Sequence, residues 1–429
     1  MKRLQKIAIL WMLTLLMGCA AHTSTAPPTG TPPPNGVFIS PTAPAAPIGT
    51  PVASVSTAIT LRVWLPPEFD PSAETFAAEI FRARLEAFER LRPNVQVEVR
   101  IKALEGDAGM LNMLTATSAV APLAMPHLVL LPRHTLEAVV LKGLATPFED
   151  VLSGTERFYP FARQLGQVQG TLYGLPMAAD VLTLVYRPAQ VPQPPANWEM
   201  LKQTPSALLF SAASPQNLFV LAQYQAAGGA LQDDMGRPLL DSTVLSTTLS
   251  ALTDVHFGGQ FPFWLTQYEN NAQVWQAYQE GRASMAVVWL SQYLKTPLSD
   301  SALAALPIAQ GEPFTLANGW LWALTVTTPS EQQTTAAELA GFLTLPEFSG
   351  QWAQAYGYLP VEAAALENWG NPAARAFVSQ AALTAHPLPP TDVLTSLGPL
   401  FQNATIQLLK EQAAIEQVVE QTMQKILEP

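Results

Sequence analysis

The stretch ITLRVWL at residues 59–65 alternates apolar and polar side chains with the period of two expected of a half-buried β-strand. It is followed by an apolar series at helical spacing over 76–91, and Asp70 and Pro71 predict the start of that helix. Alternation returns at 95–101. A strand, a helix and a strand in this order predict a βαβ unit, and therefore a parallel sheet with a right-handed crossover.

The rest of the chain continues the α/β pattern. A third strand is expected at 127–131, leading into a loop at 132–134. Further strands are expected at 181–186, 207–211, 284–289 and 319–326, and further helices at 135–142, 216–227, 271–280, 333–344, 348–356 and 403–427. We find no internal repeat in the sequence. Because no long linker divides these elements, we expect lobes built from non-contiguous segments.

The start of the chain predicts export and a lipid anchor. Residues 1–18 combine a basic end with an apolar run that is too short to span a bilayer as a free-standing helix. The sequence LMGC at 16–19 resembles the lipobox of bacterial lipoproteins, in which the cysteine is lipidated and becomes the first residue. Cys19 is the single cysteine of the chain, so we expect the lipid there. A buried unmodified cysteine is the alternative role.

Residues 19–58 predict an extended tether. They are rich in Pro, Thr, Ala, Ser and Gly, and no charged residue occurs between Cys19 and Arg62. Such a segment has too little apolar surface to offset the entropy of ordering it. In a polyproline II conformation it would reach up to about 100 Å from the membrane.

Composition and charge exclude several classes of function. Charged residues make up 13% of the chain, and 33 acidic residues face 22 basic ones, for a net charge of −11. Loss of residues 1–18 removes Lys2, Arg3 and Lys6, which leaves 19 basic residues and a net charge of −14. An acidic surface argues against nucleic-acid binding. One cysteine excludes a disulfide framework and any thiolate metal cluster.

The familiar catalytic motifs are also missing from the sequence. It contains no Gly-x-Ser-x-Gly, Ser-x-x-Lys, His-Glu-x-x-His, Walker or GxGxxG pattern, and no two histidines stand four residues apart. We therefore expect no catalytic residues, no metal and no cofactor. A pair of glycoside-cleaving carboxylates stays open at this point, because its spacing is set in three dimensions.

Several segments in a fixed order resemble one family. They are GTLYGLPM at 170–177, WEML at 198–201, QEGRASMA at 279–286, NGWLWA at 318–323 and GYLP at 357–360. They are similar to segments of the extracellular solute-binding proteins of ABC importers, the family that includes maltose-binding protein.

The resemblance implies an α/β fold of the type II periplasmic-binding-protein kind, with two discontinuous lobes and a hinge. Lobe one is expected at 59–179 plus 322–370, and lobe two at 180–321 plus 371–429. A ligand would sit in the cleft between the lobes, hinge closure would trap it, and a membrane permease would recognise the closed form. The implied partners are a small molecule, expected to be a carbohydrate, the permease subunits, and the membrane through the lipid on Cys19. We expect a monomer.

Nine residues are expected to line this cleft. Most lie at the ends of predicted strands, at the first crossover, or in a loop before a helix, where open α/β sheets bind ligands. They are Trp64, Arg133, His134, Asp180, Gln216, Asn217, Trp264, Trp289 and Trp320. Aromatic rings stack on the C–H faces of sugars, and carboxylate, amide and guanidinium groups bond their hydroxyls. The resemblance gives Asp180 the place of a carboxylate that accepts sugar hydroxyls, whereas core packing is the alternative role of each tryptophan.

The main hypothesis is therefore a lipid-anchored protein that binds a sugar or an oligosaccharide for an ABC permease. A non-sugar solute such as a polyol phosphate or a polyamine is one alternative ligand. A binding module without transport, such as a sensor lipoprotein, and a surface enzyme that acts on glycans are the alternative functions.

Overall fold

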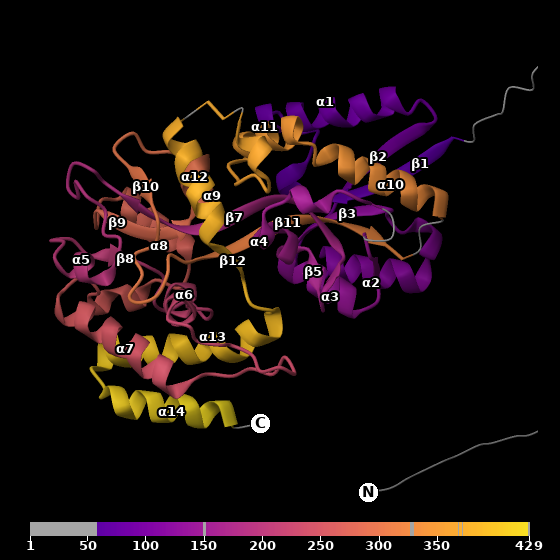
Figure 1. Cartoon of the computed structure of the whole chain (residues 1–429). Coiled ribbons are helices and arrows are strands. Elements are labelled where there is room, and N and C mark those ends of the chain that lie inside the picture. Colours follow the sequence, from indigo (N-terminus) through magenta and orange to yellow (C-terminus); the bar gives the residue numbers. More distant parts are fainter. Residues whose placement is uncertain (1–57, 149–151, 327–329, 368, 371, 428–429) are drawn as a thin grey trace, which may run out of the picture. The chain divides into compact units, whose positions relative to one another are not determined.

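The computed structural model describes residues 58–148, 152–326, 330–367, 369–370 and 372–427 (Figure 1). The predicted signal peptide at 1–18, Cys19, and the predicted tether apart from Ala58 lie outside these residues. From Ser56 onward the chain forms a single unit.

The predicted βαβ unit is present at the start of this unit. Strand β1 (Ile59–Leu65) and strand β2 (Val95–Ile101) pair in parallel over their full lengths, and helix α1 (Phe76–Leu91) connects them. In the N-terminal half of β1 every second residue is buried, because only one side of that half faces the core. The last three residues of the strand are all buried.

Helix α1 starts later than the sequence predicted. Asp70 accepts hydrogen bonds from the backbone N–H and the hydroxyl of Ser72, which makes a local turn rather than a helix start. Thr75 is the N-cap, and its Oγ1 accepts a hydrogen bond from the Ala78 N–H at 3.1 Å. The predicted start at Asp70 was therefore wrong by five residues, counted from 70 to 75.

Strand β3 (Leu128–Pro132) lies inside the sheet, between β1 and the long strand β11 (Thr315–Thr325). All five of its residues are buried, as expected for a strand with neighbours on both sides and helices on both faces. It runs parallel to β1 and antiparallel to β11, so β1 and β3 both end at the same edge of the sheet.

Strand β7 (Gly174–Tyr186) belongs to two sheets. Its first part pairs with β11, and its second part pairs with β9 (Met285–Trp289) and β10 (Ala302–Ala304). The pairing with β11 shifts register between Trp320 and Leu321, which marks a β-bulge. The short strands β4 (Ala145–Thr146), β8 (Leu208–Leu209) and β12 (Ala385–Pro387) complete this sheet, and β5 (Gln167–Val168) and β6 (Thr171–Leu172) form a separate hairpin.

The buried apolar side chains form two clusters, one around each half of the sheet. We call the elements around the first cluster lobe one and those around the second lobe two. Around lobe one lie α2 (Met110–Val120), α3 (Arg133–Leu141), α4 (Pro160–Leu165), α10 (Ser330–Leu343) and α11 (Pro346–Tyr356). Around lobe two lie α5 (Trp198–Lys202), α6 (Leu218–Ala226), α7 (Ser242–Phe257), α8 (Asn271–Gln279), α13 (Thr391–Ile406) and α14 (Ile415–Leu427). Helices α9 (Leu290–Lys295) and α12 (Pro372–Thr384) connect elements of the two clusters, as Figure 1 shows.

The predicted single helix at 403–427 is divided in two. Helix α13 ends at Ile406, a π-helical turn covers Gln407–Glu411, and Gln412 adopts a left-handed conformation with φ of 52° before α14 begins. A non-glycine residue in this conformation ends a right-handed helix. The division turns α14 back onto α7 and α13, where its apolar stripe packs against lobe two.

Candidate functional site: the interlobe cavity

A cavity of about 800 Å³ has walls from both lobes. Helix α3 and the β5–β6 hairpin form the wall of lobe one. A turn at 232–236 and the first half of α13 form the wall of lobe two. This volume lies within the range of about 300–1,000 Å³ that is typical of small-molecule sites.

Arg133 fixes the lobe-one wall. It begins α3 directly after β3, and its Nε donates to Glu137 Oε1 at 2.8 Å. Its Nη1 donates to the carbonyls of Gln164, Leu165 and Gln167 at 2.8, 2.5 and 2.7 Å. The guanidinium therefore holds in place the segment that leads into the hairpin. Although Arg133 was predicted to bind a ligand, its Nε and Nη1 atoms are engaged in these hydrogen bonds within the chain.

Glu137 connects the two walls at the base of the cavity. The residue is 6% exposed, and its Oε2 accepts hydrogen bonds from the Thr391 N–H at 3.0 Å and the Thr391 hydroxyl at 2.6 Å. Thr391 is the first residue of α13. A carboxylate at this position satisfies an N–H that has no partner within the helix and interacts favourably with the helix dipole.

Two tight turns carry exposed side chains into the cavity. In the hairpin, Gln169 has φ of 51° and Gly170 has φ of 83°. In lobe two, Asp233 accepts hydrogen bonds from the N–H groups of Met235 and Arg237. The side-chain hydrogen bond from Arg237 is the main reason that the pKa of Asp233 lies below its ordinary value.

The cavity combines hydrogen-bonding groups with two apolar side chains. His134, Gln169, Gln232 and Asp392 supply the polar groups. Leu141 and Met235 are 69% and 77% exposed and come from opposite walls. Among its described lining residues the only aromatic ring is the imidazole of His134. Such a surface is suited to a hydroxyl-rich molecule with apolar C–H faces, and to binding it without an aromatic stacking platform.

Asp180 lies at the hinge and is bonded to its own chain. Its Oδ1 accepts from the Val181 and Ser291 N–H groups at 3.0 Å each, and its Oδ2 accepts from the Ser291 hydroxyl at 2.5 Å. Burial raises the pKa of this carboxyl from 3.8 to about 7, although the Ser291 hydrogen bonds act in the opposite direction. Asp180 therefore joins the middle of β7 to the start of α9.

Of the nine residues predicted to bind ligand, the structure brings Arg133 and His134 to the cavity. It places three others in packed interiors in this conformation, so their contact with a ligand stays a prediction. Trp64 is 2% exposed in the core of lobe one, and Trp320 packs edge-on against Phe69 at 4.7 Å between ring centres. Asn217 is fully buried, and its Nδ2 donates to Thr405 Oγ1 and to the Phe401 carbonyl.

The remaining predicted residues lie away from the cavity. Trp264 and Trp289 are half-buried against the core of lobe two, and Gln216 is exposed where its Cα approaches Gly398 of α13. Their proposed contact with a ligand stays a prediction.

Sequence reasoning missed the lobe-two wall. Gln232 and Met235 of this wall were not among the predicted site residues, because the turn at 232–236 carries no sequence pattern typical of a ligand site. Pro390 followed by Thr391 is a helix-start signal that indicates the N-terminus of α13, although the last helix was predicted only from residue 403. No local signal indicates that α13 faces α3, because that contact joins segments more than 250 residues apart.

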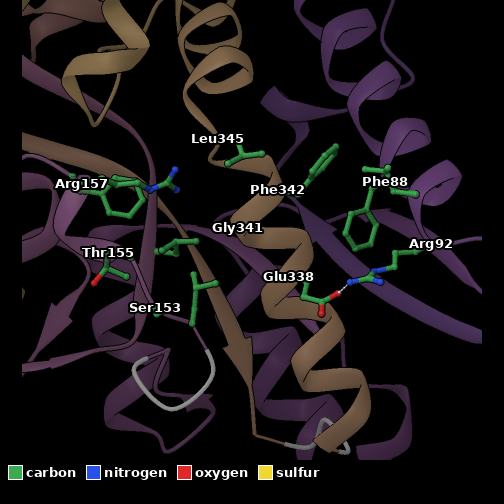
Figure 2. A pocket seen from close by; sticks show the side chains of 14 residues that line it. Phe88, Arg92, Ser153, Thr155, Arg157, Glu338, Gly341, Phe342 and Leu345 are labelled. Carbon is green, nitrogen blue, oxygen red and sulfur yellow. Dashed lines mark hydrogen bonds and ion pairs between the residues drawn. The ribbon is translucent and has the colours of Figure 1, made fainter.

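A second pocket, of about 680 Å³, lies on lobe one (Figure 2). Its apolar floor includes Phe88 of α1 and Phe342 of α10, and Arg92 forms an ion pair with Glu338 at its rim, at 2.9 Å. All its lining residues belong to elements of lobe one. Movement of one lobe against the other would not enclose a ligand there, so we take the interlobe cavity as the candidate site.

No group of three or more His, Cys, Asp or Glu residues suited to a metal ion occurs in the described residues. Over the same part of the chain, no helix has the length and apolar character required to cross a bilayer.

Comparison with known proteins identifies relatives of the chain. Residues 83–383 match the family described as bacterial extracellular solute-binding protein. The maltotriose-binding protein of Pyrococcus abyssi is 24% identical over 371 residues, which cover 81% of this chain and 79% of that protein.

Solved structures show the same fold. The cyclic α-maltosyl-1,6-maltose binding protein from Arthrobacter globiformis superposes with a TM-score of 0.70 at 17% identity, over 86% of this chain and 98% of that one. The sugar-binding protein MalE from Xanthomonas citri gives a TM-score of 0.70 at 17% identity, over 86% and 96% of the two chains. These likenesses confirm the predicted two-lobed α/β fold. With 83–383 matched, the chain belongs to the family of bacterial extracellular solute-binding proteins.

Proposed function

We propose that this chain is a lipid-anchored extracytoplasmic protein that captures a sugar or an oligosaccharide in the interlobe cavity and delivers it to an ABC permease. The observation that carries the proposal is a cavity with one wall from each lobe, in a chain of a solute-binding family. Closure of such walls around a ligand changes the shape that a membrane partner meets.

The proposed ligand class rests on the chemistry of the walls and on the relatives. His134 and Gln169 of lobe one and Gln232 of lobe two offer uncharged groups for hydroxyls, and Leu141 and Met235 offer apolar contact for C–H faces. The relatives named above bind maltotriose and a cyclic maltosyl-maltose according to their names. We therefore propose an α-glucan oligosaccharide as the first ligand to test.

Binding is expected to raise the melting temperature of the mature chain carrying Cys19→Ser. A ligand that binds only the folded state adds about 2.7 kcal/mol to the free energy of unfolding at one hundred times its Kd. The measurement is a thermal-shift screen with maltose, maltotriose, longer maltodextrins, polyols, amino acids and polyamines, followed by calorimetric titration of every hit.

Variants on each wall locate the site in the same assay. His134→Ala and Gln232→Ala are each expected to weaken binding about tenfold, because each removes a hydrogen-bonding group of the cavity. Gln203→Ala at the end of α5 is the exposed control and is expected to have no effect. A shift with an amine or amino acid and with no saccharide would overturn the sugar assignment. Sugar binding that neither wall variant weakens would overturn the cavity assignment.

The proposed lipid anchor has its own test. With wild-type Cys19 the full chain is expected in the membrane fraction of a bacterial host, whereas Cys19→Ser is expected to leave it, because thioether attachment requires the thiol. Thr23→Ala in the predicted tether serves as control and should stay with the membrane. Retention of the Cys19→Ser protein in membranes washed with carbonate would contradict the anchor.

A further inference from the structure

Helix α9 has side chains packed against both lobes. It follows β9, whose residues lie in the core of lobe two, yet its first residue, Leu290, is fully buried in the core cluster of lobe one. Leu294 packs against the same cluster. The helix ends at Lys295, which is thereby held against lobe one.

Lys295 makes polar contacts with two residues of lobe one. Its Nζ donates to Glu68 Oε1 at 2.6 Å and to the Tyr358 hydroxyl at 3.1 Å, and the Tyr358 hydroxyl donates to the same Glu68 oxygen at 2.7 Å. The ammonium also lies 4.4 Å from the centre of the Tyr358 ring. The three groups therefore form a closed triangle that combines an ion pair, two further hydrogen bonds and a cation–π contact.

Close backbone packing accompanies the triangle. Gly357 has φ of 72°, and a Cβ atom at this position would lie 2.8 Å from Cγ of Lys295 and 3.1 Å from its backbone nitrogen. A side chain on residue 357 would push α9 away from lobe one. The glycine thus permits the approach that lets Lys295 reach Glu68.

The triangle and the cavity occupy different parts of the same boundary. Glu68 follows β1 and His134 follows β3, and these neighbouring parallel strands end at one edge of the lobe-one sheet. The side chain of Glu68 meets Lys295 and Tyr358. The side chain of His134 lines the cavity.

We propose that Glu68, Lys295 and Tyr358 form an interlobe latch that holds the lobes together at one end of their boundary without a ligand. The latch favours the closed arrangement and directs ligand entry to the α3–α13 end. Its contribution is moderate, because the side chains of Lys295 and Glu68 are 41% and 33% exposed and the pair is partly screened by salt.

Single-molecule fluorescence transfer without ligand tests the latch directly. In the mature chain carrying Cys19→Ser, cysteines introduced at the exposed positions Glu86 of α1 and Ser242 of α7 carry the dyes. Lys295→Met is expected to lower the ratio of closed to open molecules about fivefold. Raising the salt concentration is expected to open the wild-type chain and to leave the variant unchanged.

Further variants separate the latch from a general loss of stability. The exchanged pair Glu68→Lys with Lys295→Glu is expected to restore part of the closed population, and Lys425→Met on α14 is expected to have no effect. Glu68→Gln provides the same measurement should Lys295→Met fail to fold. Equal distributions for the wild type and the variants at all salt concentrations, or no recovery in the exchanged pair, would overturn the latch. Since no ligand is added, this outcome is independent of whether a sugar binds.

Discussion

Glu137→Ala is expected to lower the free energy of unfolding by about 3 to 5 kcal/mol, the usual cost of removing one partner from a buried ion pair. The side chains of Arg133 and Glu137 are 11% and 8% exposed, so the change leaves a buried guanidinium without its carboxylate. It also leaves the Thr391 N–H at the start of α13 without its acceptor. Urea unfolding of the mature chain, followed by circular dichroism, measures the effect.

Two further variants serve as comparisons for Glu137→Ala. Glu137→Gln keeps an acceptor for Thr391 but loses the charge, and we expect it to lie between the wild type and Glu137→Ala. Glu86→Ala removes an exposed glutamate of α1 that pairs with Arg90 at 3.8 Å, and we expect a change below about 1 kcal/mol. Similar losses for Glu137→Ala and Glu86→Ala would show that the connection between α3 and α13 contributes little.

Asp180 is expected to make the chain less stable as the pH rises from about 4 to about 7. Its carboxyl has a pKa of about 7 in the folded chain and an ordinary value of 3.8, so the folded state binds more protons between these limits. The stabilisation is complete below the lower value and is lost as the pH passes the higher one. Its size is at most about 4 kcal/mol, at 1.36 kcal/mol per pKa unit.

Asp180→Asn isolates this effect, because the amide keeps the shape of the side chain and does not titrate. The measured quantity is the difference in free energy of unfolding between the wild type and Asp180→Asn at pH 4.5, 6 and 8. His127 acts in the opposite direction, since burial lowers its pKa from 6.5 to about 4 and stability is lost as the pH falls through that range. Both proteins contain His127, so its contribution cancels. A difference that stays constant with pH would refute the proposed titration.

Local sequence patterns predicted most of the helices and strands. The period-two stretch at 59–65 and the helical spacing at 76–91 correspond to β1 and α1, because each pattern reflects one buried face. Helix α7 was missed, since its many Ser and Thr residues weaken the apolar stripe, although Asp241 caps it. The family match confirms the resemblance drawn from five short segments, and with it the prediction of a binding protein rather than an enzyme.

The residues that line the cavity were harder to predict from the sequence than the family to which the chain belongs. Trp64 and Trp320 were candidates because they were expected at strand ends, but Trp320 lies in the middle of β11, where Phe69 packs edge-on against it. The aromatic side chains of α11 pack in turn against Phe69. Asn217 was a candidate as a loop residue, yet α13 covers it. Whether a strand-end residue faces a cleft or a neighbour depends on helices that arrive from distant parts of the chain. The lobe boundaries, likewise, stay a prediction.

The β-bulge beside Trp320 interrupts the strand pair that runs between the lobes. At this place β11 passes from pairing with Ala178 to pairing with Pro176 and skips Met177, so the ladder loses its regular spacing where the two strands run from one sheet toward the other. A bulge bends its strand and increases the local twist. Met177, the skipped residue, is fully buried in the core of lobe one, so the packing of that core fixes the direction in which the joint strand bends.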